Sequence, residues 1–250
     1  MNLAGRRVLV TRQGQDELIE RLQNAGAIPL ELPCLEIGPP ADPQALEAAA
    51  RRALDADLLV FVSERAAERF LRAAASVSAV LTDKPAAAVG AKTAAYLARA
   101  GFREVITPQV FRGEALLRAL EARLGGRMAG LRVVVPRAPE GRTELIDGLK
   151  AAGAAVDAPE AYRLLIPGPA SEAERQLAEA AEIVTFLSGR AIDGFLERLG
   201  EASGRALLLA RRVAVIGPVA ADRARALGVR VDVQPSEATV QALVDALAAW

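Results

Sequence analysis

The chain has 250 residues, with 31 Lys and Arg balanced by 31 Asp and Glu, no histidine, one cysteine and 52% hydrophobic residues. A formal charge of zero supplies no overall field for nucleic acid or an anionic membrane, and the length suits one or two domains. Without histidine the chain lacks the usual general base and the commonest zinc ligand, and Cys34 alone excludes an internal disulfide. No run approaches the roughly 18 to 20 apolar residues of a membrane span. We expect a cytoplasmic protein that binds no nucleic acid, no metal and no membrane.

Short runs rich in Val, Ile and Leu alternate with longer segments of helical period, which is typical of parallel strands covered by helices. Ten strands are too many for one small sheet but enough for two. The sequence therefore predicts an α/β protein with two doubly wound parallel sheets. The expected strands are 7–11, 28–32, 58–62, 87–89, 104–107, 132–136, 155–159, 183–187, 213–216 and 231–234.

The second half of the chain repeats the first at an offset of about 125 residues. V-L-V-T-R at 8–12 returns as V-V-V-P-R at 133–137, and LVFVSERAAERF at 59–70 returns as VTFLSGRAIDGF at 184–195. Val89-Gly90 likewise matches Ile216-Gly217. The order of the matches predicts two copies of one structural unit.

Clusters of Pro and Gly at 38–43, 125–130 and 167–169 are candidate linkers. The first and last follow equivalent places in the two repeats. Two topologies are compatible with this spacing. Either the halves fold one after the other, or each domain takes two strands from one repeat and three from the other.

Ligands of open parallel α/β sheets gather at the carboxyl ends of the strands, where helix amino termini present free amides. Here those positions hold small hydroxyl residues, glycines and cations, a lining that suits an anionic ligand. The candidate binding residues are Thr11, Arg12, Ser63, Gly90, Lys92, Thr93, Arg137, Ser188, Gly217 and Pro218, with Arg142 close to Arg137.

Structural roles compete with this interpretation. Ser63, Ser188 and Thr93 stand where a helix cap would, and Gly90 and Gly217 suit tight turns. Tyr162 precedes the third linker, where its phenol either faces a ligand or is a half-buried aromatic. Nucleotide-binding loops and the G-x-S-x-G elbow of hydrolases are absent.

Taken in order, these motifs resemble the uroporphyrinogen-III synthase family over essentially the whole chain. The residues that carry the resemblance are V-L-V-T-R at 8–12, F-V-S-x-x-A-A at 61–67, A-V-G-x-x-T-A at 88–94, P-x-x-x-x-G-E-A-L-L at 108–117, V-V-V-P-R at 133–137, Y-R at 162–163, F-L-S-x-x-A at 186–191 and I-G-P at 216–218. One departure is Ala220, where the family often has a hydroxyl residue.

The resemblance implies the exchanged topology, with one domain formed by 1–37 and 168–250, the other by 38–167, and a two-stranded hinge. It implies a cofactor-free enzyme whose interdomain cleft holds hydroxymethylbilane, a linear tetrapyrrole with eight carboxylates. Ser63, Thr93, Tyr162 and Ser188 match positions that line that cleft, with Thr11, Arg12 and Arg137 nearby.

In the family reaction the terminal hydroxymethyl group leaves as water, and the tetrapyrrole closes with its last ring inverted. That task is mainly geometric and needs few strong acids or bases. We expect Tyr162 to assist departure of the hydroxyl, and we expect a monomer that receives its substrate from the preceding enzyme of tetrapyrrole biosynthesis. The competing expectation, to which Ala220 gives weight, is a non-catalytic sensor or binding module for a tetrapyrrole or another polyanion.

Overall fold

The computed structural model describes residues 3–110, 113–141 and 143–250, and these form two compact α/β units. Unit 1 consists of Met1–Glu36 and Leu165–Trp250, and unit 2 consists of Ile37–Leu164. The strands of unit 1 are β1 (Arg7–Val10), β2 (Ile28–Glu31), β10 (Ile183–Phe186) and β11 (Arg212–Val215). Its helices are α1 (Asp16–Asn24), α7 (Glu172–Ala180), α8 (Gly189–Leu199), α9 (Glu201–Ala210), α10 (Pro218–Ala226) and α11 (Val240–Ala249).

Unit 2 has the same plan. Its strands are β4 (Leu58–Phe61), β5 (Ala86–Ala88), β6 (Val105–Ile106), β7 (Arg132–Val134) and β8 (Ala155–Asp157). Its helices are α2 (Pro43–Arg52), a short 3-10 helix (Ala53–Asp55), α3 (Glu64–Ser76), α4 (Ala91–Arg99), α5 (Gly113–Arg123) and α6 (Glu144–Ala151). Two further strands, β3 (Glu36–Gly38) and β9 (Arg163–Leu165), pair with each other where the chain passes between the units.

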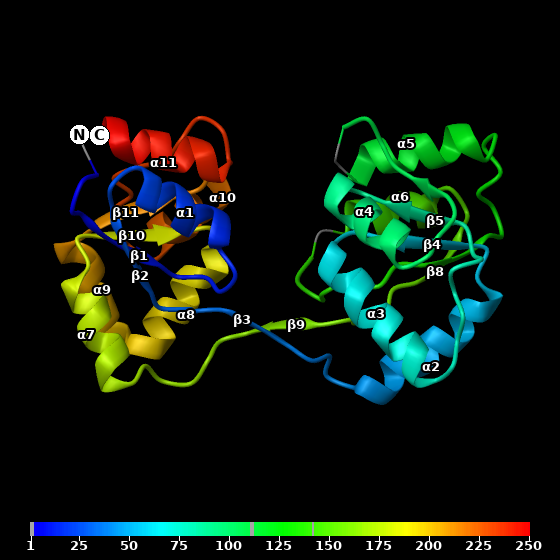
Figure 1. Cartoon of the computed structure of the whole chain (residues 1–250), viewed down its shortest axis with the longest axis horizontal. Coiled ribbons are helices and arrows are strands. Elements are labelled where there is room, and N and C mark those ends of the chain that lie inside the picture. The colour runs from blue at the N-terminus through cyan, green and yellow to red at the C-terminus, as the bar shows by residue number, and fades with distance from the viewer. Residues whose placement is uncertain (1–2, 111–112, 142) are drawn as a thin grey trace. The chain divides into compact units, whose positions relative to one another are not determined.

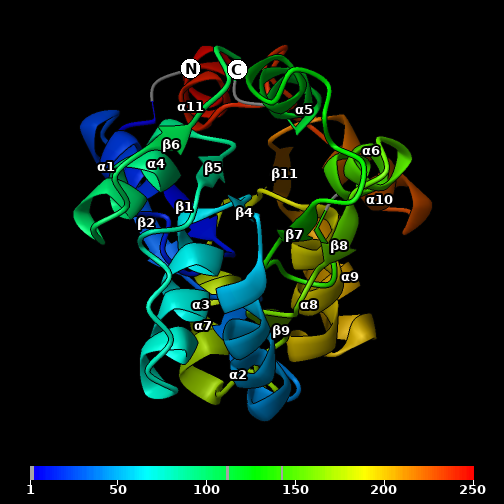
Figure 2. The same cartoon turned by 90° about the vertical axis from the view of Figure 1, so that its right-hand side faces the viewer.

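Both sheets are parallel, and their strand orders show that the repeats exchange strands. The order is β11-β10-β1-β2 in unit 1 and β6-β5-β4-β7-β8 in unit 2. In Figure 2 the five strands of unit 2 follow one another from β6 to β8 across the view. The first repeat supplies β1 and β2 to one sheet and β4, β5 and β6 to the other. Of the two topologies compatible with the sequence, the structure has the exchanged one.

Each sheet is covered on both faces because successive strand residues point to opposite sides. In β10, Val184 and Phe186 join a core with α8 and α10, whereas Ile183 joins a core with α1 and α11. In β4, Leu59 and Phe61 pack with α2 and α3, and the alternate residues pack with α5 and α6. Figure 1 shows the helix pairs α1 and α11, and α2 and α3, each on one side of its own sheet. The near-continuous apolar runs thus reflect strands buried on two faces.

Glycines end the first helix of each repeat in the same way. Gly26 after α1 and Gly153 after α6 have φ values of +82° and +88°. A Cβ on either would lie about 3 Å from the backbone of Ala4 or Ala129, so both the dihedral angle and the space require glycine. This requirement explains the repeated A-G-A sequence.

Nine of the ten predicted strands are present, most of them one or two residues shorter than expected. The prediction of a strand over 231–234 was wrong, because Val233 forms only an isolated bridge with Ala214. The Asp232 carboxylate accepts the backbone N–H of Val213 at 2.8 Å, so a side chain replaces one bond of a regular ladder. Pro235 then lacks an N–H to continue it.

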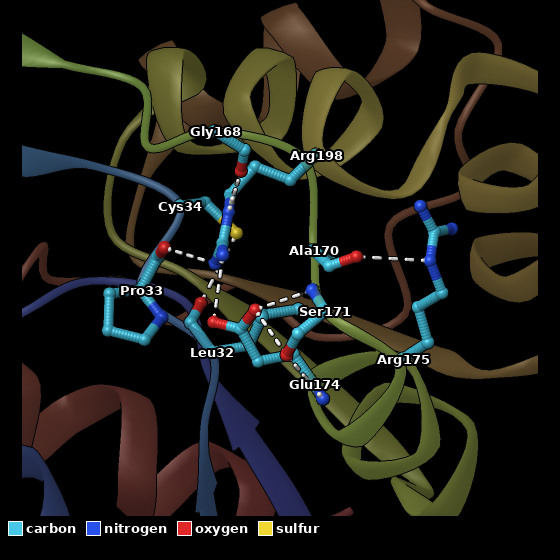
Figure 3. A network of polar contacts seen from close by, with 9 residues as sticks. All are labelled: Leu32, Pro33, Cys34, Gly168, Ala170, Ser171, Glu174, Arg175 and Arg198. Carbon is cyan, nitrogen blue, oxygen red and sulfur yellow. Dashed lines mark hydrogen bonds and ion pairs between the residues drawn. The ribbon is translucent and has the colours of Figure 1, made fainter.

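A buried arginine in unit 1 holds both segments that lead toward the paired strands β3 and β9. Arg198 on α8 is 5% exposed and donates to the carbonyl oxygens of Pro33 at 2.8 Å and Gly168 at 2.9 Å. It also forms a 2.8 Å ion pair with Glu174 (Figure 3). A buried charge is tolerated only when its donors are satisfied. The outgoing and returning segments are therefore fixed to the same guanidinium.

The surroundings of Arg198 are equally close-packed. Ser171 and Glu174 form a reciprocal cap at the start of α7, and the Cys34 thiol contacts the carbonyl oxygen of Leu32 (Figure 3). Burial raises the pKa of the Cys34 thiol to about 12, so this cysteine remains a protonated packing residue.

We expect Gly194→Ala to destabilise the protein. A Cβ at this position on α8 would overlap the carbonyl oxygen of Cys34, whereas alanine in an ordinary helix position is more stable than glycine. The loss should be about 2 kcal/mol, measured by urea unfolding. Gly168→Ala is the matched control, because nothing lies within 4 Å of its added Cβ. Equal stability of the two variants would contradict the packing of this segment.

The Glu174 carboxylate should make stability depend on pH. The hydrogen bond from Arg198 lowers the pKa of Glu174 from 4.5 to about 2. The unfolded chain therefore binds the proton first as pH falls, and the contribution present above about pH 5 is lost progressively toward pH 2. Between about pH 7 and pH 3, the wild type should lose about 1 to 2 kcal/mol more unfolding free energy than Glu174→Gln. Glu172→Gln, on an exposed residue of the same helix, should retain the wild-type pH profile.

Candidate functional site

A pocket lies at the carboxyl ends of the strands of unit 2. It has a volume of about 310 Å³ and is formed by the residues that follow β4, β5 and β7, by the first turns of α5 and α6, and by Tyr162. This is the edge of a parallel sheet where ligands are expected. The lining residues are Val62, Ser63, Val89, Gly113, Glu114, Arg137, Ala138, Gly141, Glu144, Leu145 and Tyr162.

Ser63 enters the pocket from the amino terminus of α3. Its Oγ accepts the backbone N–H of Ala66 at 3.1 Å, so the serine caps the helix. The cap uses a lone pair of Oγ and leaves the hydroxyl proton available to a ligand. Ser188 caps α8 in the same way, accepting from Ala191 at 3.3 Å. The capping interpretation is therefore confirmed for both serines, and it does not exclude ligand contact.

Arg137 is held over the loop that follows β7. Its backbone pairs with the segment before Tyr162, because its N–H donates to Pro159 and its carbonyl accepts from Ala161 at 2.8 Å. The guanidinium donates to the carbonyl oxygens of Pro139, at 3.3 Å, and Gly141. These carbonyls orient the group without neutralising it, and no described carboxylate pairs with it. Its charge can therefore act on an anion in the pocket.

Tyr162 lies immediately before β9 and is half-buried. Its ring packs against the core cluster that contains Phe61 and Phe70, while the residue also lines the pocket. The bridge between Arg137 and Glu160 fixes the preceding backbone, and the Glu160 carboxylate receives Arg163 at 2.9 Å. The structure therefore brings Ser63, Arg137 and Tyr162 together, as expected for a site.

The segment after β5 contributes less than the sequence suggests. Gly90, Lys92 and Thr93 do not line this pocket. Gly90 has extended dihedral angles and open space at a Cβ, so a tight turn does not explain it. Lys92 is exposed, and Thr93 is only 5% exposed on the inner side of α4.

In unit 1 the strand-end residues take different roles. Thr11 is 1% exposed and donates to the carbonyl oxygen of Thr185 at 2.7 Å, so its hydroxyl joins β1 to β10. Arg12 is half-buried. Gly217 allows a close approach, because a Cβ would lie 3.0 Å from that of Ala238, and Pro218 opens α10. Arg142 lies outside the described residues.

Sequence reasoning missed several lining residues of the pocket. Glu114 and Glu144 stand in the first turns of α5 and α6, where acidic residues also suit the helix dipole. A Cβ on Gly113 would lie 3.3 Å from that of Leu145, so the two helix starts approach closely. The dipeptide Gly113-Glu114 at the start of a helical segment was the available signal for the first of these residues.

Neither a metal cluster nor a membrane span is found in the part of the chain that the structure describes. No group of three or more Cys, Asp or Glu residues there could hold a metal ion. No helix there is long and apolar enough to cross a bilayer.

Comparisons with known proteins agree with the arrangement. A family model described as uroporphyrinogen-III synthase HemD matches residues 16–245. The uroporphyrinogen-III synthase of Synechococcus elongatus is 31% identical over 260 residues, covering 99% of this chain and 96% of that protein. A putative uroporphyrinogen-III synthase of Methanothermobacter thermautotrophicus is also 31% identical, covering 93% and 92%.

Two solved structures share the fold. The uroporphyrinogen-III synthetase of Helicobacter pylori has a TM-score of 0.62 at 17% identity, covering 96% of this chain and 97% of that one. A mutant uroporphyrinogen III synthase of Thermus thermophilus has a TM-score of 0.60 at 17% identity, covering 98% and 97%. These likenesses extend over both units and both exchanged segments.

Proposed function

Because the chain belongs to the uroporphyrinogen-III synthase family, we propose that it cyclises hydroxymethylbilane with inversion of the terminal pyrrole ring. The observation that supports this proposal is the pocket that gathers Ser63, Arg137 and Tyr162 at the carboxyl ends of the unit 2 strands. It combines a phenol, a hydroxyl and a guanidinium with the apolar surfaces of Val62, Val89 and Leu145. Pyrrole rings that carry carboxylates need both kinds of contact.

The proposed reaction begins when the hydroxyl of the terminal hydroxymethyl group leaves with a proton as water. The resulting cation is attacked by the substituted carbon of the far pyrrole, which gives a spiro intermediate. That intermediate reopens and recloses with the ring inverted, and a carbon-bound proton is lost. Free bilane closes without inversion, so the main task of the protein is to hold one folded pose.

We assign Tyr162 the hydrogen bond that assists departure of the hydroxyl. A phenol is a weak proton donor, so the assistance is modest. Arg137 and Arg12 serve as cations for substrate carboxylates, and Ser63, Ser188, Lys92 and the backbone at Gly90, Gly217 and Pro218 supply further polar contacts. Thr11 and Thr93 are buried, so we assign them to positioning their strand and helix ends.

We further propose that the two units are the folding domains 1–37 with 168–250 and 38–167. The division at Glu36 and Leu164 supports these limits. We also propose that the protein is a monomer in the cytoplasm and that the preceding enzyme supplies it with hydroxymethylbilane.

The alternative of a non-catalytic binding module rests on Ala220. Ala220 is 2% exposed in the core beside α8, and it occupies the place in the second repeat that Thr93 occupies in the first. Alanine at this position packs in the core against α8, so a packing role accounts for the departure and Ala220 gives no separate support to a binding module.

The deciding experiment incubates the protein with freshly prepared hydroxymethylbilane and separates the product isomers by chromatography. A synthase gives mainly the inverted isomer. A binding module leaves only the uninverted isomer that forms spontaneously, and that result would overturn the proposal.

Tyr162→Phe should lower kcat about 10- to 100-fold with a small change in KM, because the ring keeps its packing and only the hydrogen bond to the leaving group is lost. Tyr96→Phe is the control, since Tyr96 on α4 lines a different hollow, with Leu71 and Val80. Full turnover by Tyr162→Phe, with undiminished selectivity for the inverted isomer, would remove Tyr162 from the mechanism.

Ser63→Gly should separate capping from substrate binding. Glycine is a tolerable cap, so stability should fall by only a few tenths of a kcal/mol, whereas loss of the hydroxyl should raise KM several-fold. Thr239→Gly removes a simple cap of the same kind on α11, where Thr239 accepts from Ala242 outside the pocket. An unchanged KM in Ser63→Gly would show that this serine acts as a cap alone.

A further inference from the structure

A second hollow lies in unit 1, at the end of its sheet where the strands begin. Its volume is about 420 Å³, and five of the residues that line it are arginines. They come from three separate segments of the chain: Arg6, Arg7, Arg211, Arg212 and Arg230. The lining includes only two acidic residues, Glu179 and Glu182. A concave surface with an excess of one charge raises the local concentration of counterions.

The Glu182 carboxylate binds the backbone between two strands, so it does not account for the presence of five arginines in the lining. Its Oε2 accepts the backbone N–H of Arg7 at 3.0 Å, and its own N–H donates to the carbonyl oxygen of Arg7. Unit 2 has the same reciprocal pair, in which Asp57 accepts from Arg132 at 2.8 Å. In both units, therefore, a carboxylate just before one strand binds the first backbone N–H of the neighbouring strand.

The guanidinium of Arg211 has no carboxylate partner among the described residues. It donates to the carbonyl oxygens of Glu179, at 2.8 Å, and Ala210, at 3.4 Å. Its Nε is buried and has no hydrogen-bond partner in the described structure. Because Nε does not reach solvent, an oxyanion in the hollow would meet the Nη groups of this guanidinium, whose charge no described carboxylate neutralises.

The other arginines have fixed places around it. Arg6 forms a 2.7 Å pair with Glu182, Arg230 forms a 2.7 Å pair with Asp232, and Arg212 lies 3.9 Å from the ring centre of Trp250. The residues that line the hollow therefore include five arginines and two glutamates, and one of these arginines, Arg230, is paired with Asp232 outside the lining.

The repeated architecture supplies an internal comparison. The pairing of Leu59 with Ala86 in unit 2 corresponds to that of Val184 with Val213 in unit 1, so Lys84 takes the place of Arg211. Arg103 takes the place of Arg230. The hollow at this end of unit 2 is lined by Lys84 and Arg103 together with Asp83 and Glu104, which balances the charge. In unit 2 the counterparts of Arg211 and Arg230 therefore share their hollow with two carboxylates.

We propose that this arginine-lined hollow binds an anion that carries two or more negative charges on phosphate or carboxylate groups. Guanidinium groups bind both kinds of oxyanion through paired N–H donors. The site lies within unit 1 at the sheet end opposite to the strand ends that carry Ser188 and Gly217, so it is separate from the residues of the proposed reaction. Its occupation stabilises unit 1 through mass action.

The test is calorimetric titration of the full chain with inorganic pyrophosphate and, separately, with citrate, at about 150 mM NaCl. We expect saturable binding of at least one of them below about 1 mM, weakening as salt rises. Binding of pyrophosphate alone identifies a phosphate site, and binding of citrate alone identifies a carboxylate site. No saturable binding of either anion would overturn the proposal.

Matched variants assign the binding to this hollow. Arg211→Met and Arg230→Met should each weaken it about tenfold, and Lys84→Met and Arg103→Met, at the equivalent places of unit 2, should leave it unchanged. Wild-type affinity in both arginine variants, or equal losses in all four, would overturn the assignment. Conversion of hydroxymethylbilane by Arg211→Met should stay at the wild-type level, so failure of this inference is distinguishable from failure of the proposed function.

Discussion

The pairing of β1 with β10, and of β4 with β7, is the constraint on which the rest of the structure depends. At these two places within the sheets of the units a strand from one repeat lies beside a strand from the other, as also happens where β3 pairs with β9. Each half of the chain therefore cannot complete its sheet alone. The exchange makes the chain pass twice between the units, at β3 and β9, and it makes the order of strands the same in both.

Arg198 shows how unit 1 accommodates that double passage. Its guanidinium donates hydrogen bonds to Pro33, Gly168 and Glu174, so it serves the fold. The buried guanidinium is thereby satisfied by one backbone carbonyl from each connecting segment and by one carboxylate. Cys34 and Gly194 fill the remaining space, which explains why α8 carries a glycine at its centre.

The repeats share a frame but differ in what they display on it. Arg12 and Arg137, and Ser63 and Ser188, occupy equivalent places after equivalent strands, yet Tyr162, immediately before β9, corresponds to Leu35, immediately before β3. A single phenol therefore distinguishes unit 2 at its carboxyl edge, and a cluster of arginines distinguishes unit 1 at its amino edge. Each of the two related sheets has an amino edge and a carboxyl edge. The side chains at the carboxyl edge of unit 2 and at the amino edge of unit 1 differ from those at the equivalent edges of the other unit.

The amino-acid sequence by itself determined the fold class, nine strands, the repeat and the serine caps, because hydrophobic period, glycine position and cap residues act over a few neighbouring residues. The choice between consecutive and exchanged halves required contacts between residues 75 apart, such as Leu58 with Val133, and 175 apart, such as Leu9 with Val184, which spacing cannot supply. Tertiary structure alone also decided that Thr11 and Thr93 are buried, that 231–234 forms one bridge, and that Ser63, Arg137 and Tyr162 meet in one pocket. Which way a side chain faces at a strand end depends on packing from distant segments, and that packing exists only in the folded chain.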